Sequence, residues 1–301
     1  MTVGTVQKKV WTILEMLQWG TLYLTEKGFD ESRLNVELLL AHTLRLKRIQ
    51  LYTNFDRPLL EDELSSFKAS FQRRMQHEPL QYIIGTTEFM GLEFSVDKRV
   101  LIPRPETEVL VELAVRFVGE NYGGRPVRVL DIGTGSGCIA ISLVKMISTA
   151  NVTAIDISEG AAAVAQANAS KNGVDERVAI IVQDVLRSEE KDFLAKFQLI
   201  VSNPPYISAS EFGVLAPEIR EFEPPSATTD GGDGLSFYRH ISNVGRSWLE
   251  PGGSVIVEFA YNQSELVQKI FVDAGWQEVQ VTKDYSGTPR CLLARTPKRR
   301  R

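Results

Sequence analysis

From Val127 onward, short apolar runs alternate with segments of helical pattern, and this alternation constrains the fold more than any other feature of the chain. Helices are expected to follow Ser136, Ser158 and Gln263. Strands are expected at Val127–Asp131, Val152–Asp156, Val178–Val182, Leu199–Ser202 and Ser254–Phe259. Because strands that are apolar on both faces must be covered on both faces, the pattern predicts an α/β fold with a parallel sheet between helices.

The first 85 residues have a different pattern, which predicts a small helical bundle. One helical face is formed by Val6, Val10, Ile13, Leu14 and Leu17. A second helix is expected to begin near Asp30 or Ser32, either of which could cap it, and a third to follow Pro58. Their apolar positions are Leu34, Leu38 and Leu39, and then Leu64, Phe67, Phe71 and Met75, with Trp11 and Trp19 as further packing residues.

A β-hairpin is expected between the two regions, because Thr86 to Met90 and Leu92 to Val96 alternate around Gly91. Pro103 and Pro105 exclude regular structure, and Thr107 is expected to cap the helix that follows. The predicted domains are therefore a helical domain at residues 1–85, a hairpin linker at 86–103 and an α/β domain at 104–301.

Composition limits the classes of partner. The net charge is −4, whereas a protein that holds nucleic acid by its phosphates usually has a basic face, so nucleic acid is not the expected substrate. No apolar run reaches the roughly 18 residues of a membrane span, and the charged N-terminal region does not resemble a signal peptide. Two distant cysteines and three scattered histidines indicate neither a disulfide nor a metal site. We expect a cytoplasmic protein without a metal.

A glycine-rich loop follows the first strand of the α/β region. It comprises Gly133, Thr134, Gly135, Ser136 and Gly137. Ligands of parallel sheets bind beyond the carboxyl ends of the strands, where glycines let them approach the backbone. Asp156 lies at the end of the second strand, about 20 residues later, and can accept hydrogen bonds from ribose hydroxyls. The loop also fits the G-x-G-x-x-A dinucleotide pattern, so an NAD enzyme and a purely structural turn both stay open.

A second motif, Asn203-Pro204-Pro205-Tyr206, leaves the carboxyl end of the fourth strand. Proline ends a central strand, so a purely structural interpretation is available. A functional one is a site for a planar amide or amino nitrogen that takes a methyl group from a sulfonium. The Asn203 side-chain oxygen and the Pro204 carbonyl can each accept one N–H bond, and Tyr206 can stack on the amide. Such contacts orient the nitrogen and stabilise the positive charge that grows on it.

Several segments together carry a resemblance to a known family. They are Glu78 to Ile83, Leu101 to Glu108, Val129 to Gly137, Val201 to Ile207, Asp230 to Leu235 with Phe237 and Tyr238, and Pro251 to Gly253. Over nearly its whole length the chain resembles the peptide chain release factor N(5)-glutamine methyltransferases, which modify the glutamine of a Gly-Gly-Gln tripeptide. The segment from Leu101 to Glu108 is the most specific to that family.

The resemblance implies a class I, Rossmann-like domain that binds S-adenosylmethionine and a helical N-terminal domain that docks the release factor. By position, Gly133 to Gly137 would surround the methionine portion, Asp156 would hold the ribose, and Asp184 and Val185 would lie against the adenine. Asn203 to Tyr206 would hold the substrate glutamine, with Asn203 also beside the cofactor. Arg104 and Glu108 would help to shape the pocket.

The chain departs from the family's pattern in two places. Glu258-Phe259-Ala260 stands where the family often has Glu-Ile-Gly, and Thr288-Pro289-Arg290 stands where it often has an Arg-Asp-Arg segment. These positions bear on fine contacts to the substrate. Two alternatives to a monomeric protein-glutamine methyltransferase stay open: a methyltransferase of exocyclic base amines, which shares the Asn-Pro-Pro-Tyr motif, and a binding protein that only contacts translation factors.

Overall fold

The computed structural model describes residues 10–189, 192–193 and 196–297, and the chain divides into two compact units, Met1–Ile84 and Gly85–Arg301. Val6, which the sequence analysis placed on a helical face, lies outside the described residues. No helix among the residues described has the length and apolar character required to cross a bilayer.

The first unit is a bundle of helices around its own apolar core, which includes Leu39, Phe67 and Phe71. Its helices are α1 (Ile13–Glu26), α2 (Ser32–Leu44), α3 (Arg48–Thr53), α4 (Glu61–Met75) and α5 (Leu80–Ile84). Helix α1 begins later than its apolar pattern indicated, because Thr12 and Glu15 form a capping box. Val10 therefore precedes the helix and is 67% exposed.

One expectation about this unit is wrong, and two of its helices were not expected. Neither Asp30 nor Ser32 caps α2: Glu31 occupies the cap position in a left-handed conformation, and no side chain caps the helix. Helices α3 and α5 are too short to show a clear apolar period, so the sequence did not indicate them. Trp19 lies at the edge of the core, where its ring contacts those of Trp11 and Phe71.

The second unit begins with the β-hairpin, β1 (Thr86–Phe89) and β2 (Leu92–Ser95), which pair antiparallel. Met90 and Gly91 both have positive φ, as the tight two-residue turn of a hairpin requires. Phe89 and Phe94 are buried in the same core as α6 (Glu108–Tyr122). The residues expected to form a linker thus pack as part of the second unit.

A seven-stranded sheet forms the centre of this unit, in the order β5-β4-β3-β6-β7-β9-β8. The first five strands in that order are parallel, and β9 is antiparallel to both of its neighbours. The strands are β3 (Val127–Ile132), β4 (Ala150–Asp156), β5 (Val178–Val182), β6 (Phe197–Ser202), β7 (Leu249–Glu258), β8 (Gln277–Lys283) and β9 (Pro289–Arg295).

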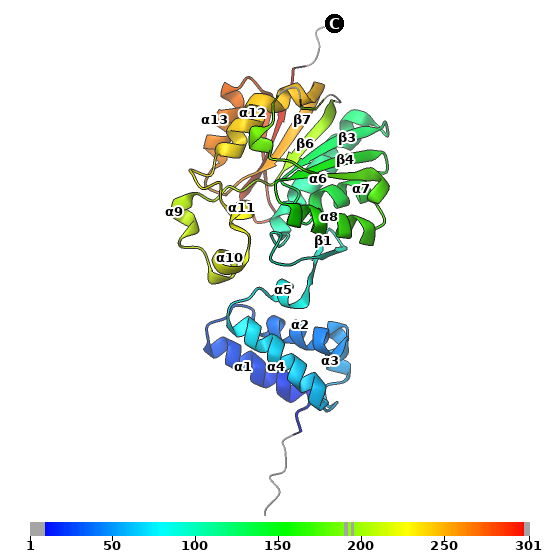
Figure 1. Ribbon diagram of the computed structural model, residues 1–301, viewed down its shortest axis with the longest axis vertical. Helices are drawn as coiled ribbons and strands as arrows, with labels where there is room; N and C mark the ends of the chain where they lie inside the picture. Colours follow the sequence, from blue (N-terminus) through cyan, green and yellow to red (C-terminus); the bar gives the residue numbers. More distant parts are fainter. Residues whose placement is uncertain (1–9, 190–191, 194–195, 298–301) are drawn as a thin grey trace, which may run out of the picture. The chain divides into compact units, whose positions relative to one another are not determined.

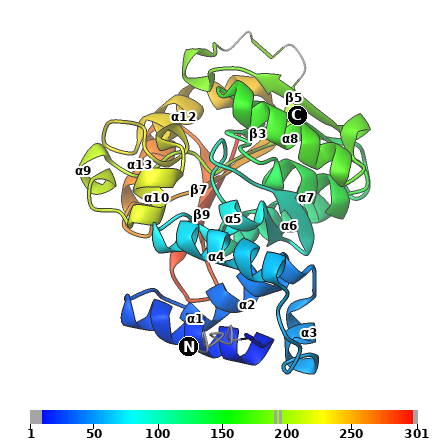
Figure 2. The same ribbon diagram turned by 60° about the horizontal axis from the view of Figure 1, so that its bottom comes forward.

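Helices cover both faces of the sheet, as Figures 1 and 2 show. The long helices besides α6 are α7 (Cys138–Met146), α8 (Glu159–Lys171), α12 (Ser236–Trp248) and α13 (Ser264–Asp273). Three short helices, α9 (Ala209–Phe212), α10 (Pro217–Phe222) and α11 (Pro225–Thr228), follow β6. Short 3₁₀ turns lie at Pro105–Thr107, Asp175–Arg177 and Val185–Arg187.

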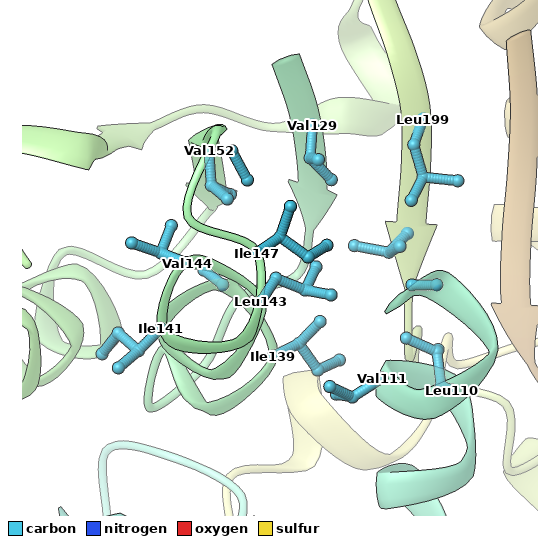
Figure 3. Packing of buried hydrophobic residues seen from close by; sticks show 14 of the residues in the cluster. Leu110, Val111, Val129, Ile139, Ile141, Leu143, Val144, Ile147, Val152 and Leu199 are labelled. Atoms are coloured by element: carbon cyan, nitrogen blue, oxygen red, sulfur yellow. The ribbon is translucent and has the colours of Figure 1, made fainter. Parts of the chain in front are cut away.

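Two apolar clusters lie on opposite faces of the sheet. In Figure 3, Leu143 and Ile147 of the α7 region point toward the central strands that contain Val129 and Leu199. The other cluster joins the sheet to α12 and α13 and includes Tyr238, Trp248 and Phe271. Every residue of β6 is buried, which explains why its central residues, Leu199, Ile200 and Val201, are apolar on both faces of the sheet.

Candidate functional site

The glycine loop and the Asn-Pro-Pro-Tyr segment leave the sheet side by side. Strands β3 and β6 are parallel neighbours with Ile132 opposite Ser202, so Gly133 and Asn203 emerge at the same edge. Gly133 has a φ of +73°, and a Cβ there would come within 4.0 Å of the Asn203 carbonyl oxygen. The parallel register therefore joins two motifs that are about 70 residues apart in the sequence.

A cavity of about 260 Å³ opens at this edge. Its walls include seven of the predicted site residues: Gly133, Gly135, Asp156, Asp184, Val185, Asn203 and Pro205. The sequence analysis missed other wall residues, among them Leu101, Ile157, Gln183, Leu186, Asp230 and Phe237. Ile157 is an apolar residue directly after Asp156 that stays 58% exposed, and its position after the acidic residue was the available signal.

Asp156 is held in place by the backbone. One carboxylate oxygen accepts the N–H of Gly135 and the other that of Ser158, each at 2.9 Å. Burial raises the pKa of Asp156, and these backbone hydrogen bonds partly oppose that rise. Because each carboxylate oxygen offers about two lone-pair sites, both can accept a further hydrogen bond from a ligand in the cavity.

The other three loop residues, Thr134, Ser136 and Gly137, do not line the cavity and instead contact the residues that the loop packs against. The Thr134 hydroxyl donates to the buried Asp131 at 2.7 Å, and the Ser136 carbonyl accepts from Asn168 at 2.9 Å. Gly137 has a φ of +81°, and a Cβ there would come within 3.2 Å of the Ala165 side chain. Glycine at this position therefore serves helix packing.

A second, smaller cavity of about 100 Å³ lies next to the first. Its walls include Arg104, Pro204 and Tyr206, together with parts of α10 and α11. Asn203 lines both cavities, as do Leu101 and Ala227. The Asn-Pro-Pro-Tyr segment thus stands at the boundary between a larger space and a smaller one.

Tyr206 is fixed through its backbone and is kept neutral by its surroundings. Its carbonyl oxygen accepts a hydrogen bond from the Gln263 side chain at 2.9 Å. Burial holds the pKa of the Tyr206 hydroxyl well above its usual range, and the nearby Glu258 adds to the rise. The residue can offer an aromatic face to a ligand, but it is not a base at neutral pH.

Arg104 and Glu108 have different surroundings. The Arg104 guanidinium pairs with the buried Glu223 at 2.6 Å, which fastens the Leu101–Glu108 segment to the end of α10. The Glu108 carboxylate accepts the backbone N–H of Met90 at 2.7 Å and so holds the hairpin turn. Glu108 lines neither cavity.

Thr107 does not cap α6 with its side chain, contrary to the sequence expectation. It is 2% exposed, and its hydroxyl oxygen accepts a hydrogen bond from Nδ2 of Asn203 at 3.1 Å. Thr107 also lowers the pKa of the neighbouring Glu258 carboxyl group. Its hydroxyl therefore interacts with the site residue Asn203 and does not cap the helix terminus.

Two buried carboxyl groups lie beneath the site at the ends of β3 and β7. Burial raises the pKa of Asp131 to about 7, although Thr134 lowers it in part. Burial likewise raises the pKa of Glu258 to about 7, although Thr107 lowers it in part. Glu258 belongs to the first departure from the family pattern, and Arg290 of the second pairs with Asp284 at 3.0 Å. In the described part of the chain, no group of three or more His, Cys, Asp or Glu residues is placed to hold a metal ion.

Two family models match the chain. The PrmC N-terminal domain matches residues 15–85, and the methyltransferase small domain matches residues 112–218. Among solved structures, the catalytic domain of hMettl16 in complex with the MAT2A 3'UTR hairpin 6 aligns with a TM-score of 0.53 and 18% identity, over 80% of this chain and 84% of that one. This likeness concerns the fold, and together with the match to the methyltransferase small domain it confirms the predicted class I methyltransferase architecture.

The chain is also similar over nearly its full length to proteins named release factor glutamine methyltransferase. It is 42% identical to the one from Geobacter sulfurreducens, over 97% of this chain and 99% of the relative. It is 40% identical to the one from Chlorobaculum tepidum, over 95% of this chain and 98% of the relative. It is 38% identical to the one from Bacillus subtilis, over 94% of this chain and 97% of the relative.

Proposed function

The chain belongs to the family of release factor glutamine methyltransferases, and on that premise we propose how its residues carry out the reaction. It is an S-adenosylmethionine-dependent enzyme that methylates the side-chain amide nitrogen of a release-factor glutamine, the one in the Gly-Gly-Gln tripeptide. The residue-level proposal depends mainly on one observation: Asn203 lines both cavities.

The residues of the larger cavity fit S-adenosylmethionine. Asp156 retains acceptor sites for two ribose hydroxyls, and the exposed side chains of Ile157 and Leu186 offer apolar contact to an adenine. Gly133 and Gly135 let the methionine portion lie close to the backbone. When bound, this cofactor supplies a methyl group on a positively charged sulfur, which is an electrophile without further activation.

The smaller cavity is assigned to the glutamine side chain. The Oδ1 atom of Asn203 and the carbonyl oxygen of Pro204 each accept one N–H of the substrate amide, and Tyr206 packs on its flat face. The ring of Pro204 fixes its φ and so limits the motion of its carbonyl. The amide nitrogen is thereby directed toward the boundary that Asn203 shares with the larger cavity.

These contacts compensate for the weakness of the nucleophile. The lone pair of an amide nitrogen is delocalised into its carbonyl group, so orientation and charge stabilisation must supply much of the rate enhancement. Two acceptors on the N–H groups favour a pyramidal nitrogen and stabilise the positive charge that develops on it. The nitrogen can lose a proton after transfer, so the site does not depend on a strong base.

We assign the docking of the release factor to the helical unit. The match of residues 15–85 to the PrmC N-terminal domain supports this role, as do exposed apolar side chains such as Leu22 and Ile49. Because every residue of the mechanism lies in one chain, we expect the enzyme to act as a monomer. We place the reaction in the cytoplasm, where release factors work.

The assignment of the acceptor is tested by incubating the enzyme and methyl-labelled S-adenosylmethionine with three acceptors. They are a bacterial release factor, the same factor with Gln→Ala in its Gly-Gly-Gln tripeptide, and nucleic acid. We expect label only on the unaltered factor. Label on nucleic acid would support the alternative, a methyltransferase of exocyclic base amines, and equal label on the Gln→Ala factor would exclude the assigned residue.

The docking role is tested with a whole release factor and a short Gly-Gly-Gln peptide as competing substrates. We expect Leu22→Ser combined with Ile49→Ser to raise KM for the whole factor and to leave the peptide unaffected. Val272→Ser on α13, which also removes an exposed apolar side chain, is the matched control. Equal loss on both substrates, or none on either, would count against docking by this unit.

A further inference from the structure

The carboxamide of Asn203 has two chemically different ends, and only one of them serves the reaction. Oδ1 accepts hydrogen bonds, whereas Nδ2 donates them. A half-turn of the amide exchanges the two atoms with almost no change in shape. With Nδ2 toward the smaller cavity, a donor would face the donor groups of the substrate amide. Some group must therefore fix the orientation of this side chain.

Thr107 is a buried residue that interacts with both Asn203 and Glu258. Nδ2 of Asn203 donates to Oγ1 of Thr107 at 3.1 Å, and Thr107 also lowers the pKa of the neighbouring Glu258 carboxyl group. Thr107 is 2% exposed and Glu258 1%. Oε2 of Glu258 has no hydrogen-bond partner among the residues described. The three residues come from the segment before α6 and from the ends of β6 and β7, so only the folded unit brings them together.

A hydroxyl group has a single hydrogen, and this fixes the direction of its hydrogen bonds. An ionised carboxylate only accepts, so when Thr107 hydrogen-bonds ionised Glu258 its hydrogen points to Glu258. The Thr107 oxygen can then only accept from Asn203, which requires Nδ2 on the Thr107 side and leaves Oδ1 for the substrate. A protonated Glu258 can itself donate to Thr107, and the threonine hydrogen is then free to bond Oδ1 in the reversed orientation.

We propose that Thr107 and ionised Glu258 are positioning residues, which act through one hydrogen-bond chain to hold Oδ1 of Asn203 toward the glutamine amide. The proposal rests on the proposed function, since it explains how the acceptor geometry of that reaction is maintained. It also predicts that protonation of Glu258 weakens methyl transfer without a change in the residues that touch the substrate.

The surroundings of Glu258 make its ionisation sensitive to pH near neutrality. Burial raises its pKa to about 7. Arg290 and Arg104 lower the pKa, as Thr107 does, and Glu106 raises it. The other titratable groups that interact with the carboxyl group are Tyr206, Tyr238, Cys138 and Cys291. Burial holds the pKa of each of these four far above neutrality, so Glu258 is the member of this group that titrates near pH 7.

The test compares full-length wild type with Thr107→Val, Thr107→Ser and Glu258→Gln. Single-turnover methyl transfer to a release factor is measured between about pH 5.5 and about pH 8.5, and calorimetry gives the S-adenosylmethionine affinity. Valine keeps the shape of threonine but removes the hydroxyl, and we expect about a tenfold lower rate with cofactor affinity retained. Serine keeps the hydroxyl and should recover most of the rate, which separates hydrogen bonding from packing.

The wild-type rate should fall as the pH drops below about 7. Glu258→Gln should be slower than wild type at high pH and should lack this decline, because a glutamine can pair with Thr107 in either direction and does not titrate. Asp131, whose pKa is also raised, remains in this variant, so loss of the decline identifies Glu258. The side-chain ¹⁵N amide signals of Asn203, assigned by their loss in Asn203→Ala, should shift over the same pH range in wild type only.

Three results would overturn the proposal: a wild-type rate that is flat across this pH range, a decline that persists in Glu258→Gln, or wild-type rates in Thr107→Val. If either Thr107→Val or Glu258→Gln does not fold, the other variant and the wild-type pH profile still test the proposal. Failure of the wild type to label the release factor would instead reject the proposed function. The two failures are therefore distinguishable.

Discussion

Asn203 differs from the other predicted site residues in lining both cavities, and its contacts explain how a four-residue motif can specify a reaction. Pro205 lines only the larger cavity, whereas Pro204 and Tyr206 line only the smaller one. At the scale of single residues, we therefore expect cofactor binding and acceptor binding to depend largely on different side chains. A substitution at Asn203 should separate the two functions.

We predict that Asn203→Ala lowers single-turnover methyl transfer by about a hundredfold, as expected when an oriented acceptor for developing charge is removed. The affinity for S-adenosylmethionine should change far less, because Asp156 and the glycine loop are untouched. Quenched-flow assays and calorimetry measure the two quantities. Asn262→Ala, which removes only an exposed amide that bonds Glu211, is the control. Equal losses of rate and affinity would contradict the assigned role.

At the scale of elements, the turn before α12 supports the site from outside the motif. The Asp230 carboxylate accepts the backbone N–H groups of Gly232, Gly234 and Ser236. The turn thereby presses Gly234 against the Asn-Pro-Pro-Tyr segment. A Cβ at Gly234 would lie 2.2 Å from the Tyr206 carbonyl oxygen, so no side chain fits there without moving the segment.

Two glycines of this turn form a matched pair for testing the contact. Gly231 and Gly234 both have a φ between 70° and 80°, but only Gly234 has atoms close to its missing Cβ. Gly231→Ala should therefore lower the stability by only about 1–2 kcal/mol, which is the penalty for placing an alanine in the left-handed conformation. Gly234→Ala should have a lower melting temperature and about a tenfold lower methyl-transfer rate, because the Tyr206 backbone must shift. Similar behaviour of the two variants would show that the contact with Tyr206 is unimportant.

At the scale of the whole molecule, Asp131 and Glu258 link stability to pH. Their pKa values of about 7 in the folded state lie above their ordinary values of 3.8 and 4.5. The folded state therefore binds more protons than the unfolded state, and these two groups stabilise the fold at low pH and lose that contribution as the pH rises through about 7. Carboxyl groups with lowered pKa values, such as Asp284, act in the opposite direction but only at acidic pH.

We expect the melting temperature of the wild type to fall between about pH 5.5 and about pH 8 as a result. Asp131→Asn and Glu258→Gln should each reduce this slope, and Glu258→Gln should be at least as stable as wild type at the upper end despite its lower activity. Differential scanning calorimetry across the range checks the sign. A melting temperature that rises over the same range in wild type, or an unchanged slope in both variants, would contradict the role of these carboxyl groups.

The sequence by itself determined the features that depend on local pattern. The apolar alternation from Val127 onward determined the parallel strands, and the Met90-Gly91 turn determined the hairpin, because both signals lie within a few residues. The class I fold, the family and the reaction predicted from the motifs are confirmed by the comparisons. The roles of single residues in binding stay predictions, which the substitutions above address.

Only the tertiary structure decided what depends on residues far apart in the chain. The antiparallel strands β8 and β9 and the short helices α9 to α11 lack a strong period of their own, so packing rather than pattern defines them. Thr107 resembled a helix cap in the sequence, yet its hydroxyl lies between Asn203 and Glu258, about 100 and 150 residues away. A hydrogen bond between such positions exists only once the sheet has set the ends of β6 and β7 side by side, and local sequence contains no record of that register.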